Sequence, residues 1–320
     1  MLPYLELIFK IIHTVCFLIG CFFNVSLCYV AIFHSPSIIK TYSVIVINVA
    51  LTNLGALVCD FLLQQRMIPS GFNLFYISYG PCVKAGPEFC FDIYGIMLHF
   101  YSYSLWLLIL AFAYRYYVML RDEPSRWALQ LTIFLVYIPS FIMMTALTLD
   151  HADPSIVRKM LKSRFPEYNL SGLVITGSVD TTQFAAMFAI IHMTVLSTPI
   201  TIGIWILRKM IMQKLTYKGI DLTSKTKNLH AQLLKALTLQ ATIPVFYLLG
   251  VIFYFIGQFG IWSLPIIEFS IFTSFLIVPI LTPLSSLVYV SPYKRFVLKK
   301  VNGKDSKSKI HTSSVITLGV

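Results

Sequence analysis

The amino-acid sequence predicts an all-α membrane protein, a seven-transmembrane helix bundle with an extracellular N-terminus and a cytoplasmic C-terminus. Two observations predict it. Of the 320 residues, 57% are hydrophobic and only 12% are charged, whereas roughly 25% of residues in soluble proteins are charged. The Lys and Arg residues also gather in alternate connections between long apolar windows, which is typical of cytoplasmic loops.

A helix needs about 20 mostly apolar residues to cross the hydrocarbon core of a bilayer. Seven windows meet this requirement, and they predict spans at about 11–33, 42–63, 90–117, 127–149, 183–207, 235–257 and 266–290. The apolar stretch 67–83 is interpreted as a loop, because Pro and Gly residues interrupt it and hydrocarbon cannot satisfy exposed backbone groups. Residues 1–300 therefore form one domain, and the basic, Ser-rich segment 301–320 is predicted to be a disordered cytoplasmic tail.

The distribution of positive charge predicts the orientation. With the N-terminus outside, 18 of the 25 Lys and Arg residues fall on the cytoplasmic side, as the positive-inside rule requires. This placement accounts for the net charge of +12 without a nucleic-acid partner. It also puts Asn169, within the acceptor sequence Asn-Leu-Ser, outside the cell as a glycosylation site.

The long connection 150–184 is predicted to contain a short helix. Asp153 is a suitable N-cap residue, and Pro154 suits the first helical position. Further along the chain, proline residues within the last three spans can bend their helices, because each removes a backbone hydrogen-bond donor. Those residues are Pro199, Pro244, Pro279 and Pro283.

Three acidic residues, Asp60, Asp92 and Glu268, are predicted to lie at the outer end of the bundle. Ionisable groups at membrane depth are costly and are functional candidates for that reason. Asp92 and Glu268 are therefore candidates for holding a cationic or hydrogen-bonding ligand. The alternative is that these carboxylates meet water or pair with Arg66 and Lys84.

A candidate pocket lies deeper in the bundle. His99 and Tyr103 are four residues apart and share a helix face, and His192 lies at a similar depth in span five. An apolar wall with a few polar groups is typical of small-molecule sites, although the same pattern also fits ordinary helix packing. The sequence lacks the ligand spacings of a metal site and the motifs of known enzyme classes, so we expect no metal, cofactor or enzymatic activity.

Two of the six cysteines are predicted to form a disulfide bond. Cys82 and Cys90 fall on the outer, oxidising side, and the Gly and Pro residues between them permit a tight closure. The other four lie in spans one and two, where cysteine commonly serves as a small packing residue.

The sequence resembles the nematode serpentine chemoreceptors, most closely class delta, over about residues 4–300. The similarity is carried by Ser35-Pro36, Thr41-Tyr42-Ser43, Asn48, Ala50-Leu51-Thr52, Gln65-Arg66, Gly80-Pro81-Cys82, Gly86-Pro87-Glu88, Cys90, the segment Phe112-Ala113-Tyr114-Arg115-Tyr116-Tyr117, residues 240–244 and Pro292-Tyr293. The resemblance implies a G-protein-coupled receptor in the ciliary membrane of chemosensory neurons, detecting a small environmental or pheromone-like molecule.

The resemblance also implies a heterotrimeric G protein as the cytoplasmic partner. Arg115 matches the arginine that the wider superfamily places at the cytoplasmic end of span three, within Asp-Arg-Tyr, although Tyr114 here replaces the aspartate. Together with Tyr116, Arg121 and Arg126 it forms the candidate coupling surface. The basic residues on this side, including those of the linker 208–235, also fit attraction to anionic membrane lipid.

Two other functional classes remain as alternatives, a seven-span ligand-gated channel and a small-solute transporter. An insect-type odorant channel would require the opposite orientation, which the charge distribution disfavours. A transporter would favour inverted repeats and matched helix breaks, and neither is visible in the sequence.

Overall fold

The computed structural model describes residues 2–216, 238–290 and 293–295. The predicted tail 301–320 and most of the basic linker lie outside the described residues. Seven helical segments are long and apolar enough to cross a membrane, which confirms the predicted seven-helix bundle. They are Pro3–Phe33, Tyr42–Leu63, Pro87–Tyr117, Arg126–Thr148, Phe184–Lys214, Thr238–Gln258 and Pro265–Tyr289.

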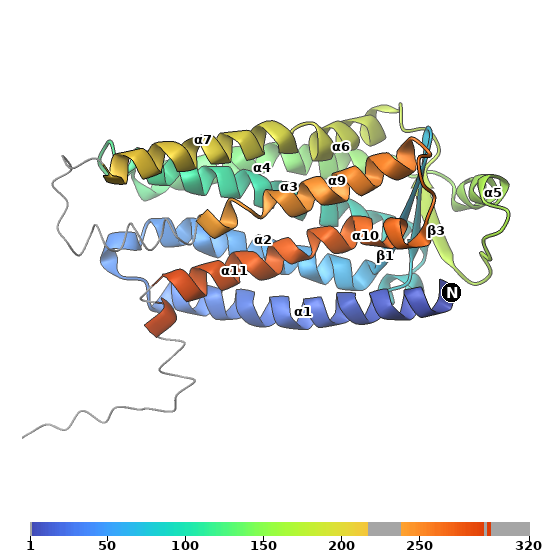
Figure 1. Cartoon of the computed structure of the whole chain (residues 1–320), viewed down its shortest axis with the longest axis horizontal. Coiled ribbons are helices and arrows are strands. Elements are labelled where there is room, and N and C mark those ends of the chain that lie inside the picture. The colour runs from blue at the N-terminus through green and yellow to red at the C-terminus, as the bar shows by residue number, and fades with distance from the viewer. Residues whose placement is uncertain (1, 217–237, 291–292, 296–320) are drawn as a thin grey trace, which may run out of the picture.

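The helices run side by side along the long axis of the molecule (Figure 1). Those of the first four spans are α1 (Leu2–Phe33), α2 (Tyr42–Leu63), α3 (Pro87–Tyr117) and α4 (Arg126–Thr148). Those of the last three are α6 (Phe184–Thr194), α7 (Ser197–Thr216), α9 (Pro244–Gln258), α10 (Pro265–Phe275) and α11 (Ile277–Tyr289). Short 3-10 turns lie at Ser37–Ile39 and Pro81–Lys84.

The last three spans are interrupted beside prolines, as their sequence predicts. Span five divides into α6 and α7 just before Pro199, and span seven divides into α10 and α11 just before Pro279. In span six, α9 begins at Pro244 after a turn. Pro283, by contrast, lies inside α11 without ending it. A proline lacks the N–H that would bond the carbonyl four residues earlier, so helices tend to break or bend there.

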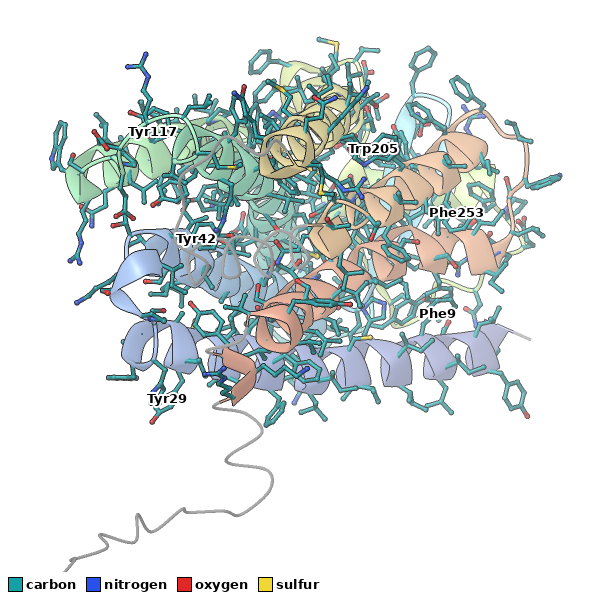
Figure 2. All side chains as sticks on the ribbon, turned by 60° about the vertical axis from the view of Figure 1, so that its left-hand side comes forward. Phe9, Tyr29, Tyr42, Tyr117, Trp205 and Phe253 are labelled. Carbon is teal, nitrogen blue, oxygen red and sulfur yellow. A yellow bond between two sulfur atoms is a disulfide. The ribbon has the colours of Figure 1, made fainter. Side chains whose placement is uncertain are left out.

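The outer surface of the bundle is apolar. Phe22, Phe134 and Phe184 are 67%, 60% and 72% exposed, and side chains of this kind extend outward along the helices, Tyr29 of α1 among them (Figure 2). Exposing such a surface to water is unfavourable, whereas contact with the hydrocarbon chains of lipids is not.

The interpretation of 67–83 as a loop is corrected by the structure. Residues Gln65–Ser70 form β1 and Asn73–Ser78 form β2, and the two strands pair antiparallel across a two-residue turn. Gly71 at the first turn position has a φ of +59°, a backbone region that glycine adopts at little cost. Pairing satisfies the backbone groups that a loop would leave exposed.

The third strand, β3 (Val174–Ser178), comes from the long connection between spans four and five and pairs antiparallel with β2. Leu74 lies opposite Ser178, and Ser78 lies opposite Val174. The three strands cross one end of the bundle, which we call the sheet end; the other end, where α3 and α11 finish, is the far end (Figure 1). A Cβ atom at Gly177 would lie 2.2 Å from the Leu74 carbonyl oxygen, so the close approach of these strands requires glycine.

The predicted helix in this connection is present as α5 (Pro154–Arg164), and the Asp153 side chain accepts a hydrogen bond from the Ser155 N–H at 2.7 Å. α5 lies beyond the sheet, at the end of the molecule (Figure 1). Val157 and Leu161 of α5 pack with Phe75 and Ile77 of β2. Because side chains alternate along a strand, the opposite face of β2 is turned toward the helices and joins the main core.

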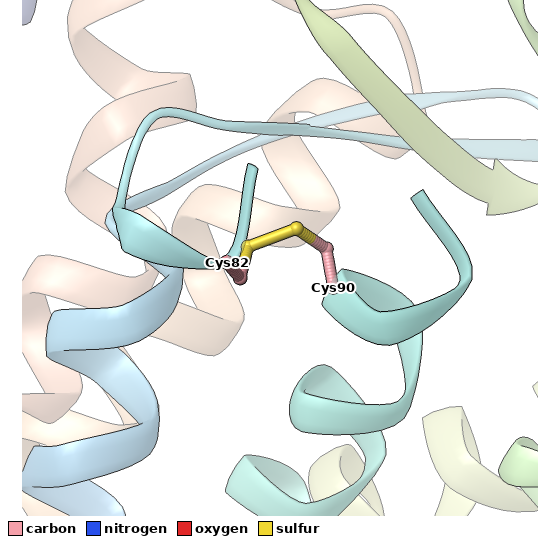
Figure 3. The surroundings of a disulfide bond; sticks show 2 residues. All are labelled: Cys82 and Cys90. Carbon is pink, nitrogen blue, oxygen red and sulfur yellow. A yellow bond between two sulfur atoms is a disulfide. The ribbon is translucent and has the colours of Figure 1, made fainter. Parts of the chain in front are cut away.

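A disulfide bond joins Cys82, in the 3-10 turn after β2, to Cys90 in the first turn of α3 (Figure 3). Their Cα atoms are 5.3 Å apart, and the two residues are eight positions apart in sequence. The bond fastens the end of the hairpin to the helix on which it rests.

Replacing both bonded cysteines, as Cys82→Ser/Cys90→Ser, is expected to destabilise the protein by about 2.5 kcal/mol, the loop entropy that closing so short a loop removes from the unfolded chain. Thermal unfolding in detergent measures the loss. Cys21→Ala in α1, which removes a cysteine that forms no disulfide, is the control. Equal unfolding midpoints for the double variant and the control would contradict a stabilising role for the bond.

Candidate functional site

A cavity lies at the sheet end, between the sheet and the helices. It encloses about 50 Å³, where one water molecule needs about 10–15 Å³ of such space. Its walls come from the sheet and from helices of spans three to seven. The lining residues are Met67, Leu74, Tyr76, Tyr94, Leu98, Leu147, Ser178, Ala186, Ala189, Ile190, Met193, Thr194, Gly250, Val251, Tyr254, Ile271, Phe272 and Phe275. A ligand larger than a few waters must displace some of these side chains.

The lining is apolar apart from a few hydroxyl groups. Tyr76 of β2 and Tyr94 of α3 join their hydroxyls at 2.8 Å, and their ring centroids are 4.2 Å apart. Burial, followed by the neighbouring Tyr94, raises the pKa of Tyr76 well above its usual 10, so its hydroxyl keeps its proton. Tyr254 of α9 adds a third phenol to the lining. The cavity can therefore hold an apolar body with one or two hydrogen-bonding groups.

The floor of the cavity is continuous with an aromatic cluster deeper in the bundle. Phe275, the last residue of α10, packs against Tyr247 of α9 at 4.9 Å and Tyr101 of α3 at 5.5 Å between centroids. The Tyr247 hydroxyl donates to the Tyr101 carbonyl at 2.8 Å. Gly250 allows the close contact, because a Cβ there would lie 2.5 Å from the Phe275 ring. A ligand that touches Phe275 therefore touches the point where span seven is broken.

A buried ion pair fixes the sheet to α10. Arg66 of β1 donates to Glu268 through Nε at 2.6 Å, and its Nη2 lies 2.5 Å from the same carboxylate oxygen. The Tyr168 hydroxyl donates to the other oxygen at 3.0 Å, and the guanidinium lies over the rings of Tyr168 and Phe269. Burial, followed by Glu268, raises the pKa of Tyr168, which keeps it a donor. Removing one partner would leave a buried charge unpaired, which is strongly destabilising.

The five residues that the sequence offers as ligand candidates do not come together, and none lines the cavity. Glu268 pairs with Arg66, which is the alternative that the sequence left open. Asp92 accepts a hydrogen bond from His151 at 2.8 Å, and both side chains are partly exposed.

His99 and Tyr103 do share a face of α3, but that face packs against α4. Their rings stack at 5.8 Å, and each meets the ring of Tyr137 edge-on. His192 of α6 shares a hydrogen bond of 2.6 Å with Ser102 of α3. These residues join neighbouring helices, as packing residues do.

Sequence reasoning missed the tyrosines of the cavity for identifiable reasons. Tyr76 was placed in a loop, and Tyr94 lies on a helix that is buried around most of its circumference, so no polar face marks its orientation. For Tyr94 the one local signal of a shared cavity face is its spacing from Leu98, four residues later on the same face of α3. The partner of Asp60 was missed as well. It is His13 of α1, whose Nδ1 lies 2.7 Å from the Asp60 carboxylate and whose Nε2 lies 3.2 Å from the Thr273 hydroxyl.

At the far end, Arg115 is buried and lies over the ring of Tyr42, 3.7 Å from its centroid. Within the described ranges it forms no ion pair with an acidic side chain. Tyr114, which stands beside it, donates instead to Glu123 at 2.8 Å. Arg121 and Arg126 are exposed, and Tyr116 is half-buried.

A second polar contact at this end joins spans six and seven. The side-chain amide of Gln240 donates to the carbonyl of Thr282 at 3.2 Å and to the hydroxyls of Ser285 and Ser286 at 2.8 and 3.1 Å. The three acceptors belong to α11. This contact lies in span six just before the turn that precedes α9, so it holds the start of the described part of that span against span seven.

Comparison with known proteins places this architecture in a family. Residues 9–299 match the family model described as "Serpentine type 7TM GPCR chemoreceptor Srd". Serpentine receptor class delta-18 of Caenorhabditis elegans is 36% identical over 316 residues, which cover 98% of this chain and 94% of that receptor. Serpentine receptor class delta-19 of the same nematode is 36% identical over 293 residues, covering 90% and 86% of the two chains.

The crystal structure of squid rhodopsin superposes with a TM-score of 0.65 at 12% identity, and the match covers 92% of this chain and 80% of that one. At so low an identity the likeness shows the fold alone. The family match and the two nematode relatives carry the assignment further: the chain belongs to the class delta serpentine chemoreceptors, a family of multi-pass seven-transmembrane G-protein-coupled receptors.

Proposed function

We propose that this receptor detects a small, largely apolar environmental or pheromone-like molecule in the cavity at the sheet end and signals to a heterotrimeric G protein at the far end. The observation that carries the proposal is the apolar cavity itself, which holds a pair of tyrosine hydroxyls and touches the interrupted spans. The chemoreceptor family supports a sensory role, and we place the receptor in the ciliary membrane of chemosensory neurons.

The chemistry of the lining limits the ligand. Most of the walls are aliphatic or aromatic, so burial of apolar surface supplies most of the binding free energy. Because the hydroxyls of Tyr76 and Tyr94 share one hydrogen bond, only one of them has a proton left to donate to a ligand, although both can accept. The Tyr254 hydroxyl can donate or accept. A ligand charge without an opposite charge in this lining would be costly to bury, so we infer a neutral ligand.

The route of the signal follows the floor of the cavity. A ligand that presses on Phe275 changes its packing with Tyr247 and Tyr101, and these three residues lie beside the interruptions of spans six and seven. A ligand shifts a conformational equilibrium only by its difference in affinity for the two states. Contacts at an interrupted helix supply such a difference, because the two halves can change their relative angle.

Arg115 is the central residue of the proposed coupling surface, with Tyr116, Arg121 and Arg126 around it. In the described structure Arg115 is stacked on Tyr42 and is buried. Release of this stack would present a guanidinium to a G protein, where it can donate several hydrogen bonds to carbonyl or carboxylate groups. Tyr42 thus takes the place of the acidic partner that Tyr114 cannot supply.

The proposed orientation puts the sheet end outside the cell. The predominance of basic residues on the opposite side supports it, and so does the disulfide at the sheet end, because such bonds persist in oxidising compartments. Asn169 is exposed in the connection between α5 and β3, so an oligosaccharide transferase could reach it.

Removal of one cavity hydroxyl tests the ligand site. A panel of volatile and pheromone-like molecules, screened in cells with a second-messenger readout, first supplies an activator with a hydrogen-bonding group. Tyr94→Phe is then expected to raise its half-maximal concentration about tenfold, since one lost hydrogen bond costs roughly 1.4 kcal/mol. Tyr103→Phe on the same helix, facing α4, is the control. A larger shift for Tyr103→Phe would place the ligand between α3 and α4 instead.

Arg115→Ala tests the coupling surface. We expect the activator to bind the variant with little change in affinity while the second-messenger response falls about tenfold or more, the loss that accompanies removal of a charged hydrogen-bonding group. Arg164→Ala, which removes an exposed charge at the sheet end, should leave the response unchanged. Full signalling by Arg115→Ala at normal surface expression would exclude the proposed role.

Glycosylation at Asn169 tests the orientation. Expressed in cells, the wild-type chain should carry one oligosaccharide that glycosidase treatment removes, and Asn169→Gln should abolish it. The sequence Asn24-Val25-Ser26 also matches the acceptor pattern, but Asn24 is fully buried and donates to the Pro279 carbonyl at 2.7 Å, so Asn24→Gln should leave the gel shift intact. An unglycosylated chain in which residue 169 is protected from external protease would reverse the orientation.

A further inference from the structure

An open groove lies on the outer surface of the bundle between α4 and α6. It encloses about 630 Å³, far more than the cavity inside the bundle. Both helices belong to membrane spans, so in a bilayer hydrocarbon chains fill or border this groove. The lining residues are Phe141, Ile142, Thr145, Ala146, Leu149, Asp150, Gln183, Phe184 and Ala185.

The contact between α4 and α6 lies between the groove and the cavity. On α4, Ala146 lines the groove and the next residue, Leu147, lines the cavity. On α6, Ala185 lines the groove and Ala186 lines the cavity in the same way. Consecutive residues of a helix point about 100° apart, so each helix turns adjacent faces to the two spaces.

The two helices are well placed to separate. α4 has the smallest buried share of the seven spans. α6 is a short segment of 11 residues, divided from α7 by the interruption before Pro199, so it can shift without moving the rest of span five. Its residues toward α4 and the cavity include three alanines, at positions 185, 186 and 189, whose small side chains leave little to displace.

The route from water, by contrast, is covered by two layers. Every residue of β2 is buried, and α5 packs on the outer face of the sheet. The Arg66–Glu268 ion pair and the Cys82–Cys90 bond fasten the sheet to α10 and α3. Entry through this cover would require opening a buried ion pair, whereas entry between α4 and α6 requires separating apolar side chains.

The polar groups of the groove select the head group of an occupant. Asp150 and Gln183 lie where α4 has ended and α6 has not yet begun, at the depth where lipid chains meet polar head groups. Asp150 carries a negative charge and no cation lines the groove. A phosphate or carboxylate would be repelled there, while a hydroxyl group could donate a hydrogen bond to the carboxylate or the amide oxygen.

We propose that the receptor takes its ligand from the membrane: a lipophilic molecule with a neutral, hydrogen-bond-donating head group settles in the α4–α6 groove and enters the cavity between the two helices. The inference rests on the proposed function, because it specifies the ligand class and route for the same cavity. It adds the groove as a second site, through which the molecule passes on its way to Tyr76, Tyr94 and Tyr254.

Photolabelling of the receptor in nanodiscs tests the proposal. The probe is an alcohol with a short hydrocarbon chain that carries a diazirine and a terminal alkyne, and labelled peptides are identified by mass spectrometry over time. The alcohol should label groove residues of α4 and α6 first, and cavity residues later. The matched fatty acid and a phosphatidic acid with the same diazirine chain, both anionic, should label the groove at least several-fold less, because of the charge of Asp150.

Variants that block the groove test the route of entry separately from the ligand site in the cavity. Ile142→Trp and Ala185→Trp fill the groove and should slow labelling of the cavity about tenfold, a typical range for changes in association rate. Leu135→Trp and Met187→Trp, on exposed parts of the same helices outside the groove, should leave the rate unchanged. Ile142 is half exposed, so its variant should fold even if the one at the buried Ala185 does not.

Three outcomes would overturn the proposal. The first is equal labelling of the groove by the phospholipid and the alcohol, which would mark the groove as a general lipid contact. The others are labelling of the cavity before the groove, and an unchanged rate of cavity labelling in Ile142→Trp. None of them would bear on the proposed function. That function fails instead if Tyr94→Phe leaves the response to the activator unchanged, a measurement that does not depend on how the molecule enters.

Discussion

Hydrocarbon offers no hydrogen bonds to a polypeptide backbone, and this constraint determines where each kind of structure occurs in the receptor. Within the spans, all described regular structure is helical. The three strands occur only at the sheet end, where they satisfy one another and are covered by α5 on one side and the bundle on the other. The same requirement applies inside α11, where Pro283 cannot bond the carbonyl of Pro279 and the Asn24 side chain of α1 donates to that carbonyl instead.

The sheet is the element that turns a helix bundle into a closed compartment. Its inner face supplies Leu74 and Tyr76 to the cavity, while its outer face buries Phe75 and Ile77 beneath α5. Arg66 fixes it to span seven through Glu268, and Cys82 fixes it to span three through Cys90. Movement of the cover is therefore tied to movement of two spans that also line the cavity, which gives the sheet end a direct mechanical connection to the helices.

The sequence was sufficient to predict the seven spans and the helix that Asp153 begins, because long apolar windows and N-cap residues are local signals. The sheet was missed because β2 is buried on both faces, so its apolar run resembles an interrupted hydrophobic loop, and its partner β3 lies about 100 residues away. Which of the candidate residues face the cavity could not be predicted for a similar reason. His99 and Tyr103 do share a helix face, but whether that face meets α4 or the cavity depends on the rotation of α3, which contacts between distant spans decide.

We propose above all that an activating molecule binds beneath the sheet, against the tyrosines of β2, α3 and α9. An experimental structure of the receptor bound to an activator from the screening panel tests it most directly. We predict ligand density bounded by Tyr76, Tyr94 and Tyr254, with its far side in contact with Phe275. Density between α3 and α4 beside His99 and Tyr103, or outside the sheet against α5, would contradict this account.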